Sequence, residues 1–411
     1  MYKISSTFFA FILLISSLNL NAQKTDDQVK DDLQLNTITT AVPFLLIAPD
    51  SRAGALGDAG AASSPDANSM HWNLSKLAFI EKNMGVSFSY TPWLRKLVPD
   101  INLAYLSGYK KLNDDLVLSA SLRYFSLGDI TFTDNNGNAY AQFRPNEFAL
   151  DAGVAQKLSD RFSGGLAVRY IYSNLTGGIS VQGTETKPGQ SFAVDVSTTY
   201  RNEDAQIFGS DAIYTLGVNI SNLGAKMAYS NNVEKDFIPM NFRLGNALTF
   251  LMDDYNKITF MADFNKLLVP TPPIYATDSS GSPIIDPTTG NYQIAEGKDP
   301  NVSVANAVFQ SWGDAPGGFK EELREINISG GMEYWYNDQF AVRIGYFHEH
   351  ATKGNRKYLT VGAGLKYSVF GIDFAYLIPT TAQGNHPLAN TIHFSLLFDF
   401  DAFKDQNKSE Q

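Results

Sequence analysis

The sequence predicts an all-β fold: a fourteen-stranded antiparallel transmembrane β-barrel with an N-terminal hatch, or plug, in its lumen. The mean hydropathy of the 411 residues is −0.16, and after the first 22 residues no run of about 18 apolar residues could form a helical span. Apolar and polar residues instead alternate with period two. A chain this polar on average can cross a bilayer only as a closed barrel, because its strands satisfy one another's backbone groups and its lumen can be wet.

Residues 1–22 are expected to be a secretory signal peptide. Lys3 supplies the positive start, Phe8–Ile15 is an unbroken apolar run, and Ala22 is a small residue suited to cleavage. The apolar run is too short to cross a bilayer, so a processed signal is the better interpretation. We expect a polar segment, residues 23–40, to follow it.

The barrel is expected over residues 83–402. Near its end, Ile392 and Phe394 alternate with His393 and Ser395, which places the first pair on the lipid side of a strand and the second pair in the lumen. A soluble β-sandwich also alternates, but strands of about ten residues and aromatic residues at the strand ends favour a membrane barrel. Strands are expected to begin near Met84, Ile101, Asp115, Pro145, Phe162, Gln190, Ala212, Phe237, Lys257, Leu323, Gln339, Lys357, Gly371 and Asn390.

The predicted connections are alternately short and long. Tight turns are expected at 112–114, 158–160, 253–255, 336–338 and 369–370, with a longer link over 202–211 in the same series. The long connections are 127–144, 174–189, 222–236, 270–322 and 379–389. Outer-membrane barrels have short periplasmic turns and long outer loops. The pattern therefore predicts a protein of the Gram-negative outer membrane, with 270–322 as a long outer loop and the C-terminal tail, 403–411, in the periplasm.

Residues 41–82 are expected to form the hatch. An apolar stretch from Val42 to Ile47 leads into a Gly- and Ala-rich run that ends at Leu77, and this composition is neither strand-like nor polar enough for a free tail. The hatch residues singled out are Arg52, Gly54, Gly57, Asp58, Gly60, Asp66, Trp72 and Asn73. Turn and capping chemistry would explain them equally well. A charge inside a barrel needs a partner, and the lumen-facing candidates are Arg123, Asp151, Arg169, Asp195, Arg343, Lys366 and Asp373.

Composition argues against several classes of function. The net charge of −10 does not suit a nucleic-acid partner, and the absence of Cys excludes disulfides, thiolate zinc sites and Cys nucleophiles. His348 and His350 lie on one strand face without a visible third ligand. The polar run 134–138 lacks the Glu of a calcium loop, and no nucleophile-elbow motif is present. We therefore expect no metal, no cofactor and no enzymatic activity.

The hatch residues also carry a family resemblance. The run PDSRAGALGDAG, residues 49–60, followed by HWNLSKL, residues 71–77, resembles the N-terminal hatch of the FadL family of outer-membrane transporters. Arg52 and the three glycines fit the first part of the family pattern, whereas Leu74 and Ser75 stand where that family has Pro-Ala. The complete string over 49–79, with the barrel behind it, resembles the PorV family, the FadL-like outer-membrane component of the type IX secretion system.

The resemblance implies a role in protein secretion. It implies docking beside the translocon barrel SprA, binding of secreted cargo with C-terminal targeting domains, and transfer of that cargo to an attachment complex containing the protease PorU, all within outer-membrane lipid. Loops 222–236 and 270–322 are the expected contact surface. Two alternatives stay open: a FadL-type transporter of fatty acids or other hydrophobic molecules, with an apolar pocket near the hatch, and an outer-membrane hydrolase that modifies lipopolysaccharide.

Overall fold

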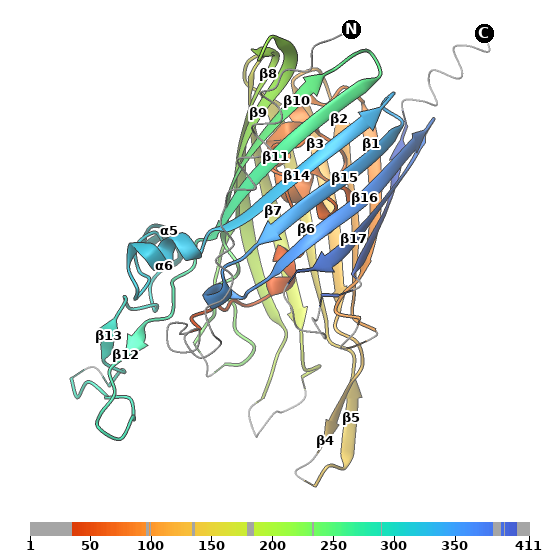
Figure 1. The fold of residues 1–411 in the computed structure, drawn as a ribbon. Coiled ribbons are helices and arrows are strands. Elements are labelled where there is room, and N and C mark those ends of the chain that lie inside the picture. The colour runs from red at the N-terminus through yellow and green to blue at the C-terminus, as the bar shows by residue number, and fades with distance from the viewer. Residues whose placement is uncertain are drawn as a thin grey trace.

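Fourteen strands form a closed antiparallel barrel, shown in Figure 1. The computed structural model describes residues 35–400 except 96–97, 99, 134–135, 179–184, 232–233, 289, 381–387 and 390. The predicted signal peptide and C-terminal tail lie outside the described residues. Around the barrel the order is β1-β18-β17-β16-β15-β14-β11-β10-β9-β8-β7-β6-β3-β2, and the first and last strands pair to close it. The predicted fold class and strand number are confirmed.

The strand positions follow the alternation of the sequence closely. The barrel strands are β1 (Met84–Pro92), β2 (Asn102–Lys111), β3 (Leu116–Ser126), β6 (Asn146–Lys157), β7 (Phe162–Asn174), β8 (Gly189–Ile207), β9 (Ser210–Gly224), β10 (Asn241–Leu251), β11 (Asn256–Leu267), β14 (Asn327–Tyr336), β15 (Phe340–His348), β16 (Lys357–Tyr367), β17 (Phe370–Pro379) and β18 (Ile392–Asp399). Two expected strand starts are wrong. Leu323 lies in a helix, and Phe237 precedes β10, because Phe237 packs in an apolar cluster at the barrel rim.

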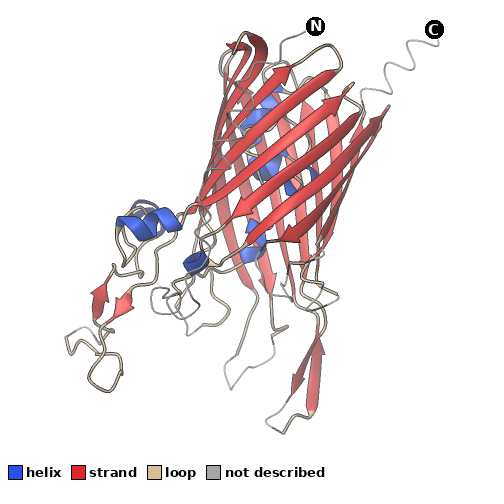
Figure 2. Cartoon of the chain, viewed as in Figure 1, coloured by secondary structure: helices blue, strands red, loops and turns tan. Residues whose placement is uncertain are grey.

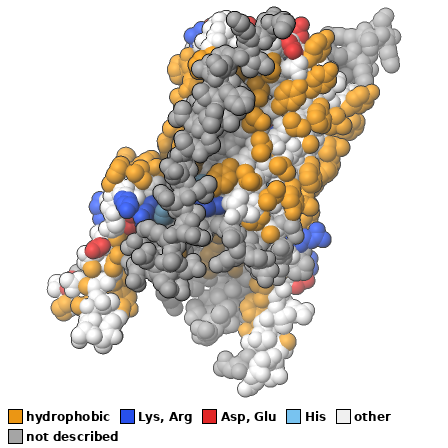
Figure 3. Space-filling model, viewed as in Figure 1, with side chains coloured by type: hydrophobic (Ala, Val, Ile, Leu, Met, Phe, Trp, Pro, Cys, Tyr) orange, Lys and Arg blue, Asp and Glu red, His pale blue; other side chains and the backbone are white. Residues whose placement is uncertain are grey.

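Side chains alternate between the outer wall and the lumen along each barrel strand. In β15, Val342 and Ile344 are 41% and 45% exposed, whereas Ala341 and Arg343 are 0% and 4% exposed. The exposed set forms the apolar belt that covers the barrel wall in Figure 3. Burial of this belt in lipid is what a transmembrane barrel requires, so the alternation predicted from the sequence is confirmed.

Connections are short at one end of the barrel and long at the other, as Figure 2 shows. The expected link over 202–211 is wrong, since β8 continues to Ile207. Only Phe208 and Gly209 form the turn, with φ of 53° and 78°, as in the two-residue hairpin turn that needs positive φ at both positions. The long-loop end carries β4 (Ile130–Thr133), β5 (Ala139–Phe143), β12 (Ile274–Tyr275), β13 (Ile294–Glu296), α5 (Val304–Gln310), α6 (Phe319–Arg324) and η3 (Ala351–Lys353). None of the helices in the described part of the chain is long and apolar enough to cross a membrane.

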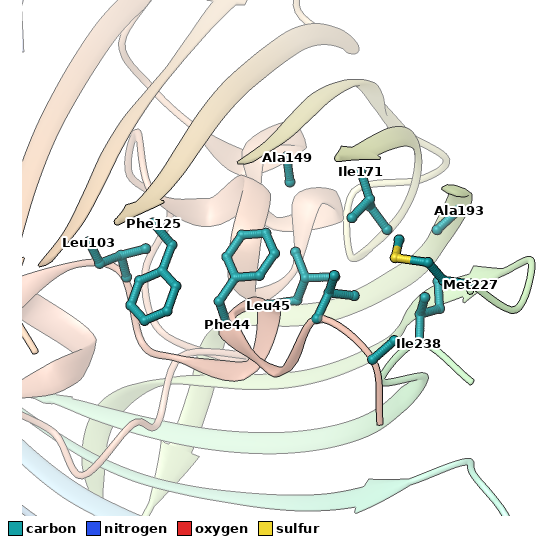
Figure 4. Close-up of a cluster of buried hydrophobic side chains, with 11 residues drawn as sticks. Phe44, Leu45, Leu103, Phe125, Ala149, Ile171, Ala193, Met227 and Ile238 are labelled. Carbon is teal, nitrogen blue, oxygen red and sulfur yellow. The ribbon is translucent and has the colours of Figure 1, made fainter. Parts of the chain in front are cut away.

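Residues 41–80, called the inner segment below, lie within the ring of strands (Figure 1). Its short helices are η1 (Pro43–Leu46), α3 (Ser51–Gly54), α4 (Ser69–Trp72) and η2 (Leu74–Phe79). Phe44 and Leu45 of η1 pack among inward-facing side chains of several strands, including Phe125 and Ile171 (Figure 4). The rings of Phe44 and Phe125 are stacked with centroids 6.0 Å apart. The lumen of this barrel is therefore filled by the protein's own chain.

Candidate functional site inside the barrel

Asp50 joins the two α-helical turns of the inner segment. As the N-cap of α3, its carboxylate accepts a hydrogen bond from the Ala53 amide at 3.0 Å. Its other oxygen accepts from the indole Nε1 of Trp72 at 2.6 Å. Asp50 therefore caps α3 and also fixes the position of Trp72.

The glycines of the inner segment permit close contact with the barrel wall. Gly57 has a φ of +66°, and a Cβ there would lie 2.5 Å from the carbonyl oxygen of Tyr346 in β15. A Cβ on Gly60 would lie 2.4 Å from the indole of Trp72. Gly54 lies against the ring of His393 at an ordinary contact distance of 3.4 Å. The Gly57 position therefore requires glycine both for its backbone conformation and for the approach of the wall.

A chain of buried charges ties the inner segment to β14, β15 and β17. Arg52 donates two hydrogen bonds to Glu333, at 2.9 Å from Nε and 2.7 Å from Nη2, and a third to Asp66 at 2.9 Å. Glu333 also accepts from Arg343 at 2.7 Å, and Arg343 donates to Asp373 at 2.6 Å. Glu333 is 2% exposed and Arg343 4%. Each buried charge in this chain has a partner of opposite sign, as burial demands.

A second group of charges lies on the opposite side of the lumen. Arg169 forms salt bridges to Asp151 and Asp195 on the neighbouring strands β6 and β8. Arg123 hydrogen-bonds the ring of His71 in α4 and donates to the carbonyl oxygen of Leu45 at 2.8 Å. Of the lumen-facing residues expected to pair with the hatch, Arg123 is therefore the one that bonds it directly.

The other predicted lumen residues bond to the barrel itself. Arg343 reaches the inner segment only through Glu333, and Asp373 only through Arg343. Lys366 is exposed at the end of β16, where its ammonium lies 4.5 Å from the ring centroid of Trp335. The expected pairing of Asp151, Arg169, Asp195, Lys366 and Asp373 with hatch side chains is thus replaced by pairing among barrel residues.

Three residues that the sequence analysis did not single out contribute strongly to the site. Glu333 accepts the paired hydrogen bonds of Arg52. Asp263 of β11 accepts from the amides of Gly60 and Ala61, both at 2.8 Å. Lys76 in η2 is 2% exposed and donates to the Gly60 carbonyl at 2.6 Å, and burial lowers its pKa to about 8. Glu333 could have been predicted from the sequence, because the period-two alternation of β14 places it on the lumen side with Ser329 and Trp335.

Asn73 and Asp58 complete the contacts with the wall. The Asn73 amide donates to the Ala61 carbonyl at 2.9 Å and to the Thr199 hydroxyl of β8 at 3.0 Å. Asp58 accepts from the Tyr358 hydroxyl of β16. Burial raises the pKa of the Asp58 carboxyl to about 6, although the hydrogen bond from Tyr358 opposes the shift. The inner segment is thus hydrogen-bonded to strands on several sides of the barrel.

A cavity of about 410 Å³ lies between the inner segment and the long-loop end of the barrel. Its lining is mixed, with Ile38, Leu46 and Phe347 beside charged groups. Arg243 lies over the ring of Trp72, with its guanidinium carbon 4.5 Å from the centroid. The Arg243 Nε donates to Asn265 at 2.5 Å, and within the described structure no acceptor binds its other two nitrogens. The cavity therefore presents hydrogen-bond donors suited to an anionic group.

The histidines do not form a catalytic constellation in the part of the chain that the structure describes. His393 hydrogen-bonds Thr91, His350 bonds Thr352 and His71 bonds Arg123, so no described His joins a hydroxyl to a carboxylate. Among the same residues there is also no group of three His, Cys, Asp or Glu side chains that could hold a metal ion.

The fold and the occupied lumen define a class of outer-membrane β-barrel that holds its own N-terminal chain inside the ring of strands. The family model "Type IX secretion system protein PorV" matches residues 29–274. This chain therefore belongs to the PorV family of type IX secretion proteins. Comparison with the curated proteins gave no match.

Solved structures with a similar barrel include toluene transporters and a FadL homologue. The Ralstonia pickettii toluene transporter TbuX has a TM-score of 0.45 and 12% identity, covering 86% of this chain and 97% of its own. The Pseudomonas putida toluene transporter TodX has a TM-score of 0.45 and 10% identity, with coverage of 89% and 98%. A Pseudomonas aeruginosa FadL homologue has a TM-score of 0.44 and 12% identity, with coverage of 89% and 100%.

Proposed function

We propose that this chain is a non-enzymatic component of type IX secretion that works through its outer surface rather than through an open pore. The observation that carries the proposal is the inner segment, which fills the lumen of a PorV-family barrel and is held by buried ion pairs. Moving the segment out of the lumen would separate Arg52 from Glu333 of the barrel wall, and breaking a buried ion pair in this way is costly. The inner segment thus acts as a hatch that stays closed.

The long-loop end supplies the proposed contact surface, and it faces the cell exterior in this proposal. The connection between β11 and β14, residues 268–326, projects far beyond the barrel wall (Figure 1). Its tip is a two-stranded hairpin, in which β12 pairs with β13. Loops positioned by a rigid scaffold commonly carry binding function. We propose that this tip and loop 222–236 bind the translocon barrel SprA and the C-terminal targeting domains of cargo, which then pass to the PorU-containing attachment complex.

Deletion of the hairpin tip tests the proposal. Tyr275 pairs with Ile294, so removing residues 277–292 and joining the ends by a short turn keeps the anchored part of the loop. The matched control removes 132–141 from the β4–β5 hairpin, where Ile130 pairs with Phe143. We expect the first deletion to abolish cargo release and co-purification of the translocon, and the second to leave both intact. Both variants should fold, as judged by heat-dependent migration in SDS gels. Normal secretion with the first deletion would contradict the proposed surface.

A second candidate function is transport or binding of amphipathic molecules. The cavity beside Arg243 favours it, because apolar walls and an available guanidinium suit a hydrophobic molecule with an acidic head. Extraction of the protein from native membrane and mass spectrometry of bound lipids test this candidate. A stoichiometric fatty acid that is lost in Arg243→Ala would support it, whereas the same lipid content in both proteins would argue against it.

A further inference from the structure

The helical pair α5–α6 lies against the outside of the barrel, and Lys266 shows how it is attached. In β11 the inward side chains include Asp263 and Asn265, whereas Phe264 points outward and is 38% exposed. Lys266 lies two residues after Phe264 and therefore also points outward, yet it is only 3% exposed. Glu322 and Glu325 bind its ammonium at 2.9 Å and 2.5 Å. The α6 turn therefore covers the outer wall at the rim and neutralises a lysine that would otherwise face lipid.

The apolar belt of the barrel continues onto this helical pair. The Trp312 ring lies 5.5 Å from that of Phe242 in β10, at an interplanar angle of 73°. Beside it on the wall, Phe264 and Ile328 are 38% and 43% exposed and pair across β11 and β14. Trp312 is itself 50% exposed. One apolar surface thus runs from the lipid-facing strands onto the loop.

The part of this surface that lies on α5 and α6 carries large exposed apolar side chains, although the loop is otherwise polar. Phe309 is 81% exposed, Phe319 78% and Leu323 52%. Phe319 and Leu323 are four residues apart and so share one side of α6. Lys320 and Arg324 share the adjacent side, and neither has a carboxylate within salt-bridge distance in the described structure. Figure 3 shows apolar side chains on the side of this protrusion nearer the belt and basic side chains on the side nearer the loop tips.

We infer that α5–α6 is an interfacial membrane anchor, with its aromatic face inserted in the outer leaflet and its free cations bound to anionic headgroups. The apolar surface of the barrel continues onto the helical pair, which lies on the lipid-facing wall at the level where the strands end. Aromatic residues with adjacent Lys or Arg are typical of the boundary between acyl chains and headgroups. The inference rests on the proposed orientation of the long loops toward the cell exterior. It divides loop 268–326 into a lipid-bound base and a free β12–β13 tip.

Site-directed spin labelling tests the anchor in the complete protein. The chain has no Cys, so Phe309→Cys and Phe319→Cys each give one label, in vesicles of phosphatidylcholine with phosphatidylglycerol. Ile344→Cys on the outer wall is the lipid reference, and Ser280→Cys at the exposed tip is the water reference. We expect labels at 309 and 319 to collide with oxygen as at 344 and to be shielded from a water-soluble nickel chelate. The matched control, Lys320→Cys, should be accessible to the chelate.

Two outcomes would overturn the anchor. One is chelate accessibility at 309 and 319 equal to that at Ser280→Cys. The other is shielding that appears only after purified translocon is added, which would make this face a protein-docking surface. Headgroup binding has its own test: Lys320→Glu with Arg324→Glu should make the label at 319 shallower in anionic vesicles only, and an unchanged depth would refute that part. Because the vesicles contain only this protein and lipid, failure of the proposed secretion role would leave the result unchanged.

Discussion

Arg52 provides the most direct test of how the lumen is kept closed. Arg52→Ala removes the cation that lies between Asp66 and Glu333. Glu333 keeps a partner, because Arg343 remains at 2.7 Å. Asp66 loses its one salt bridge within the described structure, although its side chain is only 16% exposed. Breaking one side of a buried pair costs about 3–5 kcal/mol. Since Glu333 stays paired, we expect the lower end of this range, so that the free energy of local opening of the inner segment falls by about 3 kcal/mol.

Hydrogen exchange measures that cost directly. A loss of about 3 kcal/mol corresponds to roughly a hundredfold faster exchange through local opening. We expect this increase for amides of residues 50–80, with protection of the barrel strands unchanged. Planar-bilayer recordings should show transient openings in Arg52→Ala and a closed barrel in the unmodified protein. The matched control is Arg144→Ala, which breaks the exposed pair with Asp129 and should change neither measurement.

Unchanged exchange over residues 50–80 in Arg52→Ala would refute the reasoning, since the ion pairs would then not hold the segment. Large, stable channels in the unmodified protein would refute it from the other side. Asp66→Asn added to Arg52→Ala supplies an internal check. It removes the carboxylate left unpaired, so part of the lost protection should return. No recovery would show that Arg52 acts through Glu333 alone.

Two further predictions concern backbone and pH. Gly57→Ala should destabilise the inner segment by about 1–3 kcal/mol, because Gly57 has positive φ and contacts Tyr346. The control is Gly137→Ala, also at positive φ but in open space, which should leave exchange over residues 50–80 unchanged. Equal exchange in the two variants would contradict this account. Burial raises the pKa of Asp314 beside α6 to about 6 from the ordinary 3.8, so its ionised form disfavours the packed helical pair above pH 6. Asp314→Asn should therefore raise the free energy of local opening of α5–α6 at pH 7.5 by about 1 kcal/mol after allowance for solvent screening, and so slow hydrogen exchange there. This stabilisation should disappear toward pH 4. A pH-independent effect would exclude this cause.

The barrel could be predicted from the sequence because its signal is local. Each strand carries its own alternation, so Phe340 and Ala341 already indicate which side faces lipid. The partners in the lumen could not be predicted, since Arg52 and Glu333 are 281 positions apart and the register between them depends on the closed barrel. The charges themselves were predictable, and Arg123 bonds the inner segment as expected. Other predicted pairs are wrong, because Arg169 satisfies Asp151 and Asp195 on adjacent strands. Adjacent strands offer the shortest separations, so these charges pair with one another rather than with the inner segment.

The outer loop was the least predictable part for a physical reason. The α5 and α6 helices are very short, and isolated helices of such length are unstable in water. They form here because Lys266 binds Glu322 and Glu325 and because Ala307 packs against the rim cluster. Those contacts join segments that are distant in sequence. The expected strand start at Leu323 was therefore wrong, since this apolar residue belongs to the exposed side of α6 rather than to β14.

Strand β11 anchors both unusual parts of the molecule, one on each of its faces. Asp263 points inward and holds the amides of Gly60 and Ala61, while Lys266 points outward and holds α6. The two side chains share no bonding partner. Changes at such sites are expected to be independent. Asp263→Asn should speed exchange in the inner segment alone, and Lys266→Ala should speed it in α5–α6 alone.

The double variant decides whether the outer loop controls the lumen. If the hatch and the loop are separate devices on one strand, the two changes in free energy should add to within about 0.5 kcal/mol. A larger coupling, measured by exchange in both regions, would mean that displacement of α5–α6 loosens the inner segment through β11. In that case binding at the outer tip could open the barrel, and the proposal of a hatch that stays closed would fail. Additivity would instead mean that α5–α6 does not control the inner segment through β11.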